Sequence, residues 1–140
     1  MKNYIYIIAP ALGWLAAQAI KFILANRKDG INWGDFLQSG GFPSSHSAFM
    51  VALTTVVGIN YGIKSVTFAV VAAVTAIILY DSFGVRQTTG NQTKAIFELA
   101  ERSKIRLRSK IHISEGHTVM EVFSGCLLGI LVGVILNWLI

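Results

Sequence analysis

The sequence predicts an all-α integral membrane protein: a bundle of about four transmembrane helices plus a cytoplasmic amphipathic helix. Of the 140 residues, 54% are hydrophobic and only 14% are charged, whereas soluble domains usually carry about a quarter charged residues. Several apolar runs approach or exceed the roughly 17–25 residues that cross a bilayer. The length allows one domain, which we expect to comprise residues 1–140.

Four apolar segments are expected to span the membrane. They are residues 4–25, 44–60, 64–81 and 117–139. The first follows Lys2 but is longer than the apolar core of a secretory signal, and no small-residue cleavage site follows it. The second holds Thr54 and Thr55 but no formal charge, and it reaches spanning length when counted from Pro43.

Residues 87–115 form the long connection before the last span, and they contain a repeating apolar pattern. Ile96, Leu99 and Leu107 recur at helical spacing with basic residues around them. This pattern favours an amphipathic helix on the inner membrane surface, its basic face toward anionic headgroups. A polybasic run can also bind nucleic acid, but in so apolar a chain we expect the bilayer and no nucleic acid as partner.

The lysines and arginines outside the spans are unevenly distributed. Four passes place two on one side of the membrane and nine on the other. The two are Lys2 and Lys64, and the nine are Arg27, Lys28, Arg86, Lys94, Arg102, Lys104, Arg106, Arg108 and Lys110. Because basic residues in short loops stay in the cytoplasm, the chain is predicted to lie in the cell (inner) membrane with both termini outside.

Polar residues gather at the helix ends on the predicted cytoplasmic side. Gln18 and Lys21 end the first span, Ser44, Ser45 and His46 start the second, Asp81 and Arg86 follow the third, and His117 and Glu121 start the fourth. Ionisable groups bordering a span are costly and usually functional. Each also has a structural interpretation: a serine caps a helix, Lys21 snorkels to the interface, and Asp81 pairs with Arg86.

The spacing in the last span strengthens the functional interpretation. His117 and Glu121 lie four residues apart, hence on one helix face, and Gly125, Gly129 and Gly133 continue that face. Such a glycine stripe marks close helix packing, so the pair is expected to face the bundle interior. A carboxylate bonded to one imidazole nitrogen makes the other a better base or nucleophile.

The predicted cluster has the components of a phosphoryl-transfer site. His46 supplies a second imidazole, Lys21 and Arg86 supply positive charge, and helix N-termini supply backbone N–H groups that suit a phosphate.

Three segments resemble the type 2 phosphatidic acid phosphatase superfamily, which includes the vanadium haloperoxidases, and most closely its small divergent branch of membrane proteins. They are "GGFPSSHSA" (residues 40–48), "YDSFGVRQTTGNQ" (80–92) and "GHTVMEVFSGCLLG" (116–129). The first resembles the family's Pro-Ser-Gly-His motif, with Ser45 in place of glycine. The third resembles the motif that carries the nucleophile, with Glu121 in place of aspartate.

The resemblance implies a lipid phosphate phosphatase acting through a phosphohistidine. His117 would attack phosphorus, Glu121 would orient it and His46 would protonate the leaving alkoxide. Lys21, Arg86, Ser44 and Ser45 would hold the phosphate oxygens, with Gln18, Asp81 and Gln92 as supporting residues. The arginine expected five residues before the nucleophile is replaced by His112, so its role is assigned to Arg86, with His112 as a bystander or a substitute ligand.

We predict no metal or other cofactor. The alternative is that Asp81 joins Glu121 in holding Mg²⁺, which prefers carboxylate oxygens. The substrate expected from an inward-facing site is phosphatidylglycerol phosphate or phosphatidate. The alternatives are a non-catalytic protein of the same fold that binds phosphate or lipid headgroups, an outer-face polyprenyl pyrophosphate phosphatase, and a haloperoxidase.

Gly58 and Gly62 suggest a homodimer contact, or internal packing alone.

Overall fold

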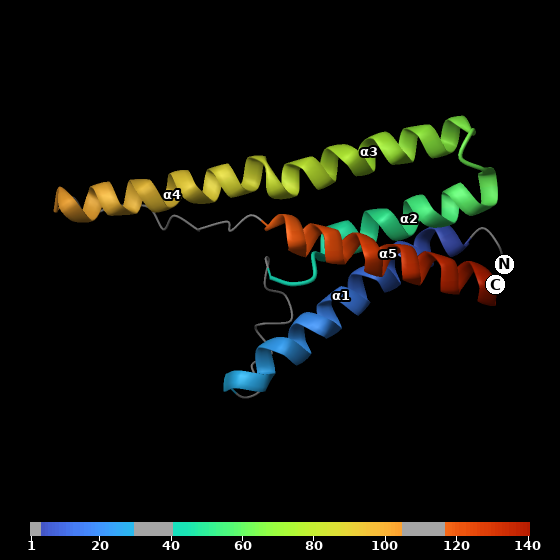
Figure 1. The fold of residues 1–140 in the computed structure, drawn as a ribbon, viewed down its shortest axis with the longest axis horizontal. Helices are drawn as coiled ribbons and strands as arrows, with labels where there is room; N and C mark the ends of the chain where they lie inside the picture. Colours follow the sequence, from blue (N-terminus) through green and yellow to red (C-terminus); the bar gives the residue numbers. More distant parts are fainter. Residues whose placement is uncertain (1–3, 30–40, 105–116) are drawn as a thin grey trace.

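The computed structural model describes residues 4–29, 41–104 and 117–140, and every regular element within them is a helix. The five α-helices, drawn in Figure 1, are α1 (Ile5–Asp29), α2 (Ser45–Tyr61), α3 (Val66–Phe83), α4 (Val85–Arg102) and α5 (Val119–Leu139). The predicted all-α class is therefore confirmed for the described residues. The predicted 117–139 helix begins two residues later, and the predicted 64–81 helix lies at 66–83.

Helix α2 is the centre of the bundle, because it contacts α1, α3 and α5. Helix α5 also contacts α1, and α4 contacts only α3 among the described helices. The chain runs back and forth, so α1 and α3 finish at the end where α2 and α5 begin (Figure 1). We call this end of the bundle the polar end, since the predicted functional residues flank it. The end that contains the turn between α2 and α3 is called the opposite end.

The glycine stripe of α5 packs directly on α2. Gly125, Gly129 and Gly133 are all buried, and a Cβ added at Gly129 would lie 2.7 Å from the carbonyl oxygen of Ala48. A Cβ at Gly13 of α1 would lie 2.7 Å from the same oxygen. Small residues thus let three helix backbones approach closely around Ala48, as the four-residue spacing predicts.

Side-chain caps fix where the helices begin. Ser44 caps α2, its Oγ accepting the Ser47 N–H at 3.3 Å, and Ser65 caps α3 by accepting the Phe68 N–H at 3.1 Å. Such bonds satisfy N–H groups that a helix start leaves without intrahelical partners. Pro43 lies just before the Ser44 cap, and the serine cap weighed from the sequence is present.

Three of the described stretches are long and apolar enough to cross a membrane: Ile5–Leu24, Val66–Arg102 and Val119–Leu139. Their large side chains are widely exposed, for example Val66 at 80% and Trp138 at 85%, which suits surfaces that face lipid. Helix α2 has 17 residues and lies among the others. A helical membrane protein is therefore supported, and the count of four spans stays a prediction.

The predicted amphipathic segment, residues 87–115, overlaps in part with α4, which begins at Val85 directly after the α3 cap residue, Gly84. Ile96 and Leu99 are exposed on it. Residues 105–115 of the predicted connection, including His112, lie outside the described residues. A position on the membrane surface stays a prediction.

The two glycines proposed as a dimer contact have roles within the chain. A Cβ at Gly58 would lie 3.0 Å from the Phe68 ring, and Gly62 ends α2 with φ of 81°, in a region that favours glycine. Internal packing, the alternative interpretation, accounts for Gly58, and the backbone conformation accounts for Gly62. The homodimer stays a prediction, but these two glycines no longer support it.

Candidate active site

The polar end is held together by backbone hydrogen bonds between helix ends. The Ser44 N–H donates to the Glu121 carbonyl at 2.9 Å, and the His117 N–H donates to the Ser82 carbonyl at 3.0 Å. These bonds tie the start of α2 and the end of α3 to the start of α5. The polar clusters that are far apart in the sequence are therefore brought to one place.

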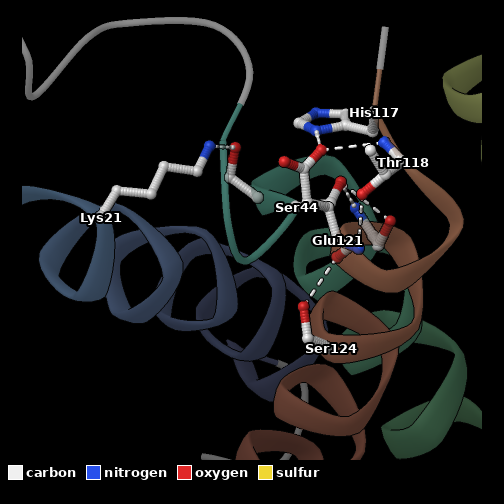
Figure 2. Close-up of polar contacts among 8 residues, drawn as sticks. Lys21, Ser44, His117, Thr118, Glu121 and Ser124 are labelled. Carbon is white, nitrogen blue, oxygen red and sulfur yellow. Dashed lines mark hydrogen bonds and ion pairs between the residues drawn. The ribbon is translucent and has the colours of Figure 1, made fainter. Parts of the chain in front are cut away.

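His117 and Glu121 form the predicted pair. The His117 Nδ1 lies 3.2 Å from the Glu121 Oε2, and His117 is only 5% exposed. With a carboxylate as its partner, Nδ1 carries the proton and Nε2 keeps its lone pair. Figure 2 shows the imidazole standing over the first turn of α5, with Glu121 beneath it.

Glu121 also anchors that first turn. Its Oε2 accepts the Thr118 N–H at 2.9 Å, while the Thr118 Oγ1 accepts the Glu121 N–H at 3.3 Å. This reciprocal capping box holds the carboxylate in place beneath His117. Thr118 was not among the predicted site residues, although Thr-Val-Met-Glu at 118–121 is the pattern that marks a capping box.

His46 faces the same region from the first turn of α2. Its ring centroid lies 6.5 Å from that of His117, with the ring planes tilted by 58°. His46 is exposed whereas His117 is buried. The two imidazoles therefore differ in environment, which suits them to different chemical roles.

Lys21 and Ser45 connect α1 to the start of α2. The Lys21 Nζ donates to the Ser45 Oγ at 3.3 Å, and the two residues are 9% and 4% exposed. Figure 2 shows the lysine side chain extending from α1 toward this start. Lys21 is thus bonded within the bundle, and the alternative that it snorkels to the interface stays a prediction. Gln18, one turn earlier, is 4% exposed, and its Oε1 accepts no hydrogen bond from the described residues.

Ser44 is committed to holding the helix start. It is fully buried, and its Oγ accepts hydrogen bonds from both the N–H and the Oγ of Ser47. Its own N–H donates to the Glu121 carbonyl. A buried cap with its groups engaged suits a structural role better than direct contact with a phosphate. Ser45, bonded to Lys21, is the better placed of the two serines.

The remaining predicted residues lie on α3 and α4. Asp81 is half-buried and precedes Ser82, whose carbonyl bonds the His117 backbone. Arg86 is the second residue of α4. Gln92 is exposed midway along α4, which extends away from the bundle in Figure 1. The structure thus places Asp81 near the His117 backbone and does not bring Gln92 to the cluster.

Candidate metal ligands were predicted at Asp81 and Glu121. In the part of the chain that is described, no three His, Cys, Asp or Glu side chains gather closely enough to hold an ion. Neither the absence of a cofactor nor the Mg²⁺ alternative is tested by this, and both stay predictions.

Comparison with known proteins agrees with the sequence motifs. Residues 1–132 match the family model described as "Divergent PAP2 family". The "Uncharacterized membrane protein YuiD" of Bacillus subtilis (strain 168) is 35% identical over 136 residues, covering 85% of this chain and 82% of the relative. No solved structure gives a significant match.

Proposed function

Because this chain belongs to the divergent PAP2 family, we propose that it is a membrane lipid phosphate phosphatase that forms a phosphohistidine at His117. The observation that carries the proposal is the 3.2 Å contact between His117 and Glu121, with a second imidazole 6.5 Å away between centroids. The buried Lys21 of α1, bonded to Ser45 at the start of α2, supplies the positive charge that a phosphate requires.

His117 acts as the nucleophile. Its Nε2 lone pair attacks phosphorus while the bond from phosphorus to the ester oxygen breaks, and that oxygen takes the bonding electrons. Glu121 holds the Nδ1 proton and stabilises the positive charge that develops on the ring. Water then attacks the phosphohistidine, the phosphorus–nitrogen bond breaks, and inorganic phosphate leaves with His117 restored.

His46 acts as the general acid. As an imidazolium it gives a proton to the departing alkoxide, and as a neutral base it then takes a proton from the attacking water. Its exposure suits both steps, because it can exchange protons with water between turnovers.

Lys21 and Ser45 bind the non-bridging phosphate oxygens. The 3.3 Å bond between them is long, so an anionic oxygen competes well for the ammonium group. Ser44 serves by fixing the start of α2. The resemblance assigns Arg86 to the same phosphate.

Phosphate release by the purified protein from a panel of lipid phosphates tests the proposed function. Comparing substrates whose leaving groups differ in their need for a proton tests the role of His46. Loss of a general acid costs about 10²–10⁴-fold, and less for an activated ester whose leaving group needs no proton. His46→Ala should therefore slow hydrolysis of a lipid phosphate far more than that of nitrophenyl phosphate. Equal losses on the two substrates would instead assign His46 to phosphate binding.

A non-catalytic role, binding phosphate or lipid headgroups, is the second candidate. Two observations favour it: His117 is only 5% exposed, and Ser45 stands where the family motif usually has glycine. Binding of a lipid phosphate with no phosphate release would support this candidate.

The side of the membrane that the polar end faces limits which lipid phosphates can reach it. The polar end lies at the side of the predicted basic loops, so we propose that it faces the cytoplasm and the inner leaflet. Phosphatidylglycerol phosphate is then the first substrate to test and phosphatidate the second.

Cysteine labelling tests this orientation. In a Cys126→Ser background, Ile63→Cys at the opposite end and Gln92→Cys on α4 both lie at exposed positions. An impermeant maleimide applied to intact cells should label the first and not the second. Labelling of position 92 alone would reverse the orientation and favour an outer-leaflet polyprenyl pyrophosphate.

A further inference from the structure

An apolar groove lies between α3 and α5, away from His117. It has a volume of about 420 Å³, with α2 as its floor and α3 and α5 as its walls. The walls meet at the polar end, where the His117 N–H bonds the Ser82 carbonyl. They separate toward the opposite end, as Figure 1 shows. The groove is thus a consequence of the angle between α3 and α5.

The groove offers no unsatisfied polar group to an occupant. Thr54 donates its hydroxyl proton to the Met50 carbonyl at 2.8 Å, so Thr75 is the donor in the 2.7 Å bond between the two threonines. Thr55 donates to the Val51 carbonyl at 2.7 Å. The rest of the lining includes Ile59, Phe68 and Ile130. An occupant therefore gains by apolar contact alone.

The length of the groove matches one leaflet of a bilayer. Its lining on α2 and the following turn runs from Val51 to Ile63, which corresponds to about 18 Å at 1.5 Å per residue. Half of a hydrocarbon core is about 15 Å. The hydrogen bond between Thr54 and Thr75 crosses from α2 to α3 toward the middle of the bundle, so the groove extends from the opposite end to about the bilayer centre.

The volume of the groove suits a thin occupant better than a whole helix. A helix about 10 Å across would fill roughly 1,400 Å³ over that length, more than three times the groove. An acyl chain is a thinner apolar chain that is available at this depth. At the opposite end of the bundle, Ile63 is followed directly by the exposed Lys64. In the predicted arrangement of four spans, this cation lies at the level of the lipid headgroups.

We propose that this groove binds one acyl chain of an anionic phospholipid from the leaflet at the opposite end, with its phosphate beside Lys64. The site is separate from His117 and does not depend on the proposed phosphatase activity. The bound acyl chain would fill the space between α3 and α5 and so maintain the angle between these two helices.

Native mass spectrometry of the full chain in mild detergent tests this, with phosphatidylglycerol or phosphatidylcholine added. One phosphatidylglycerol should be retained, in preference to phosphatidylcholine by about fivefold, the effect of one lysine near the surface. Lys64→Gln should remove the preference, and Lys94→Gln, on α4, should keep it. Ile59→Trp should fill the groove and lower retention severalfold, whereas Ile7→Trp, at a 70% exposed position of α1 outside the groove, should not.

Several results would overturn the assignment. Retention unchanged by Ile59→Trp, or lost equally with Ile7→Trp, would place the lipid elsewhere. A preference that survives Lys64→Gln would remove Lys64 from the site. A dimer that Ile59→Trp dissociates would make a second copy the occupant, and absence of any retained lipid would refute the site. Ile63→Trp, at the exposed mouth, provides a second filling variant if Ile59→Trp does not fold.

Discussion

Replacing His117 by alanine should abolish phosphate release, lowering kcat by about 10⁴-fold or more, with the protein still folded in detergent. The side chain supplies the imidazole nitrogen that contacts the Glu121 carboxylate, whereas the bond that positions residue 117 uses its backbone N–H and survives in alanine. Activity and thermal unfolding measured on one preparation separate loss of the nucleophile from loss of fold.

Glu121→Gln tests the role of the carboxylate that orients His117. Glutamine also completes a capping box, so α5 should begin as before, but the neutral amide no longer stabilises an imidazolium. We expect a loss of about 10²–10⁴-fold with little change in stability, by comparison with the carboxylates that orient catalytic histidines. If His117→Ala kept more than a few per cent of activity, another residue would be the nucleophile.

Gly125→Ala should strongly destabilise the protein. A Cβ at this position would overlap the Ser44 carbonyl oxygen and lie 2.8 Å from the Ser47 Cβ. Backbone cannot move aside as a flexible side chain can, so we expect a loss at or above the roughly 1–3 kcal/mol typical of overpacking. The drop in unfolding temperature in detergent measures it. Because Ser44 fixes the start of α2, any folded fraction should also show a disturbed cluster.

Val134→Ile is the control for this prediction. It also adds one carbon to α5, but at a position that is 48% exposed and faces away from the buried glycines. Its effect should stay within about 0.5 kcal/mol. Equal stability of the two variants would mean that α5 does not pack on α2 through the glycine stripe.

Features that depend on helical periodicity could be predicted from the sequence. A spacing of four placed the three glycines on one face of α5, and they pack on α2. The same spacing predicted the contact between His117 and Glu121, which is present although His117 precedes the N-cap Thr118 and so lies outside α5. The same local rule would have found the Thr118 cap. Neighbours three and four residues apart share a helix face whatever the rest of the fold does.

Features that depend on how helices meet could not be predicted. The bond from the Ser44 N–H to the Glu121 carbonyl, and the packing of Gly58 on Phe68, follow from interhelical approach. The groove between α3 and α5 depends on the angle between two helices, which no residue spacing encodes. Gln92 was grouped with the cluster by a motif, whereas α4 carries it away from the bundle.

The most direct test of the central claim is to trap the covalent intermediate. The purified protein is mixed with ³²P-labelled phosphatidylglycerol phosphate or phosphatidate, quenched within a turnover, and digested for peptide mapping. We predict an acid-labile, base-stable label on the peptide that contains His117, present in wild type and absent in His117→Ala. A label on a different residue, or tight binding of the lipid phosphates with neither label nor phosphate release, would contradict a phosphohistidine mechanism at His117.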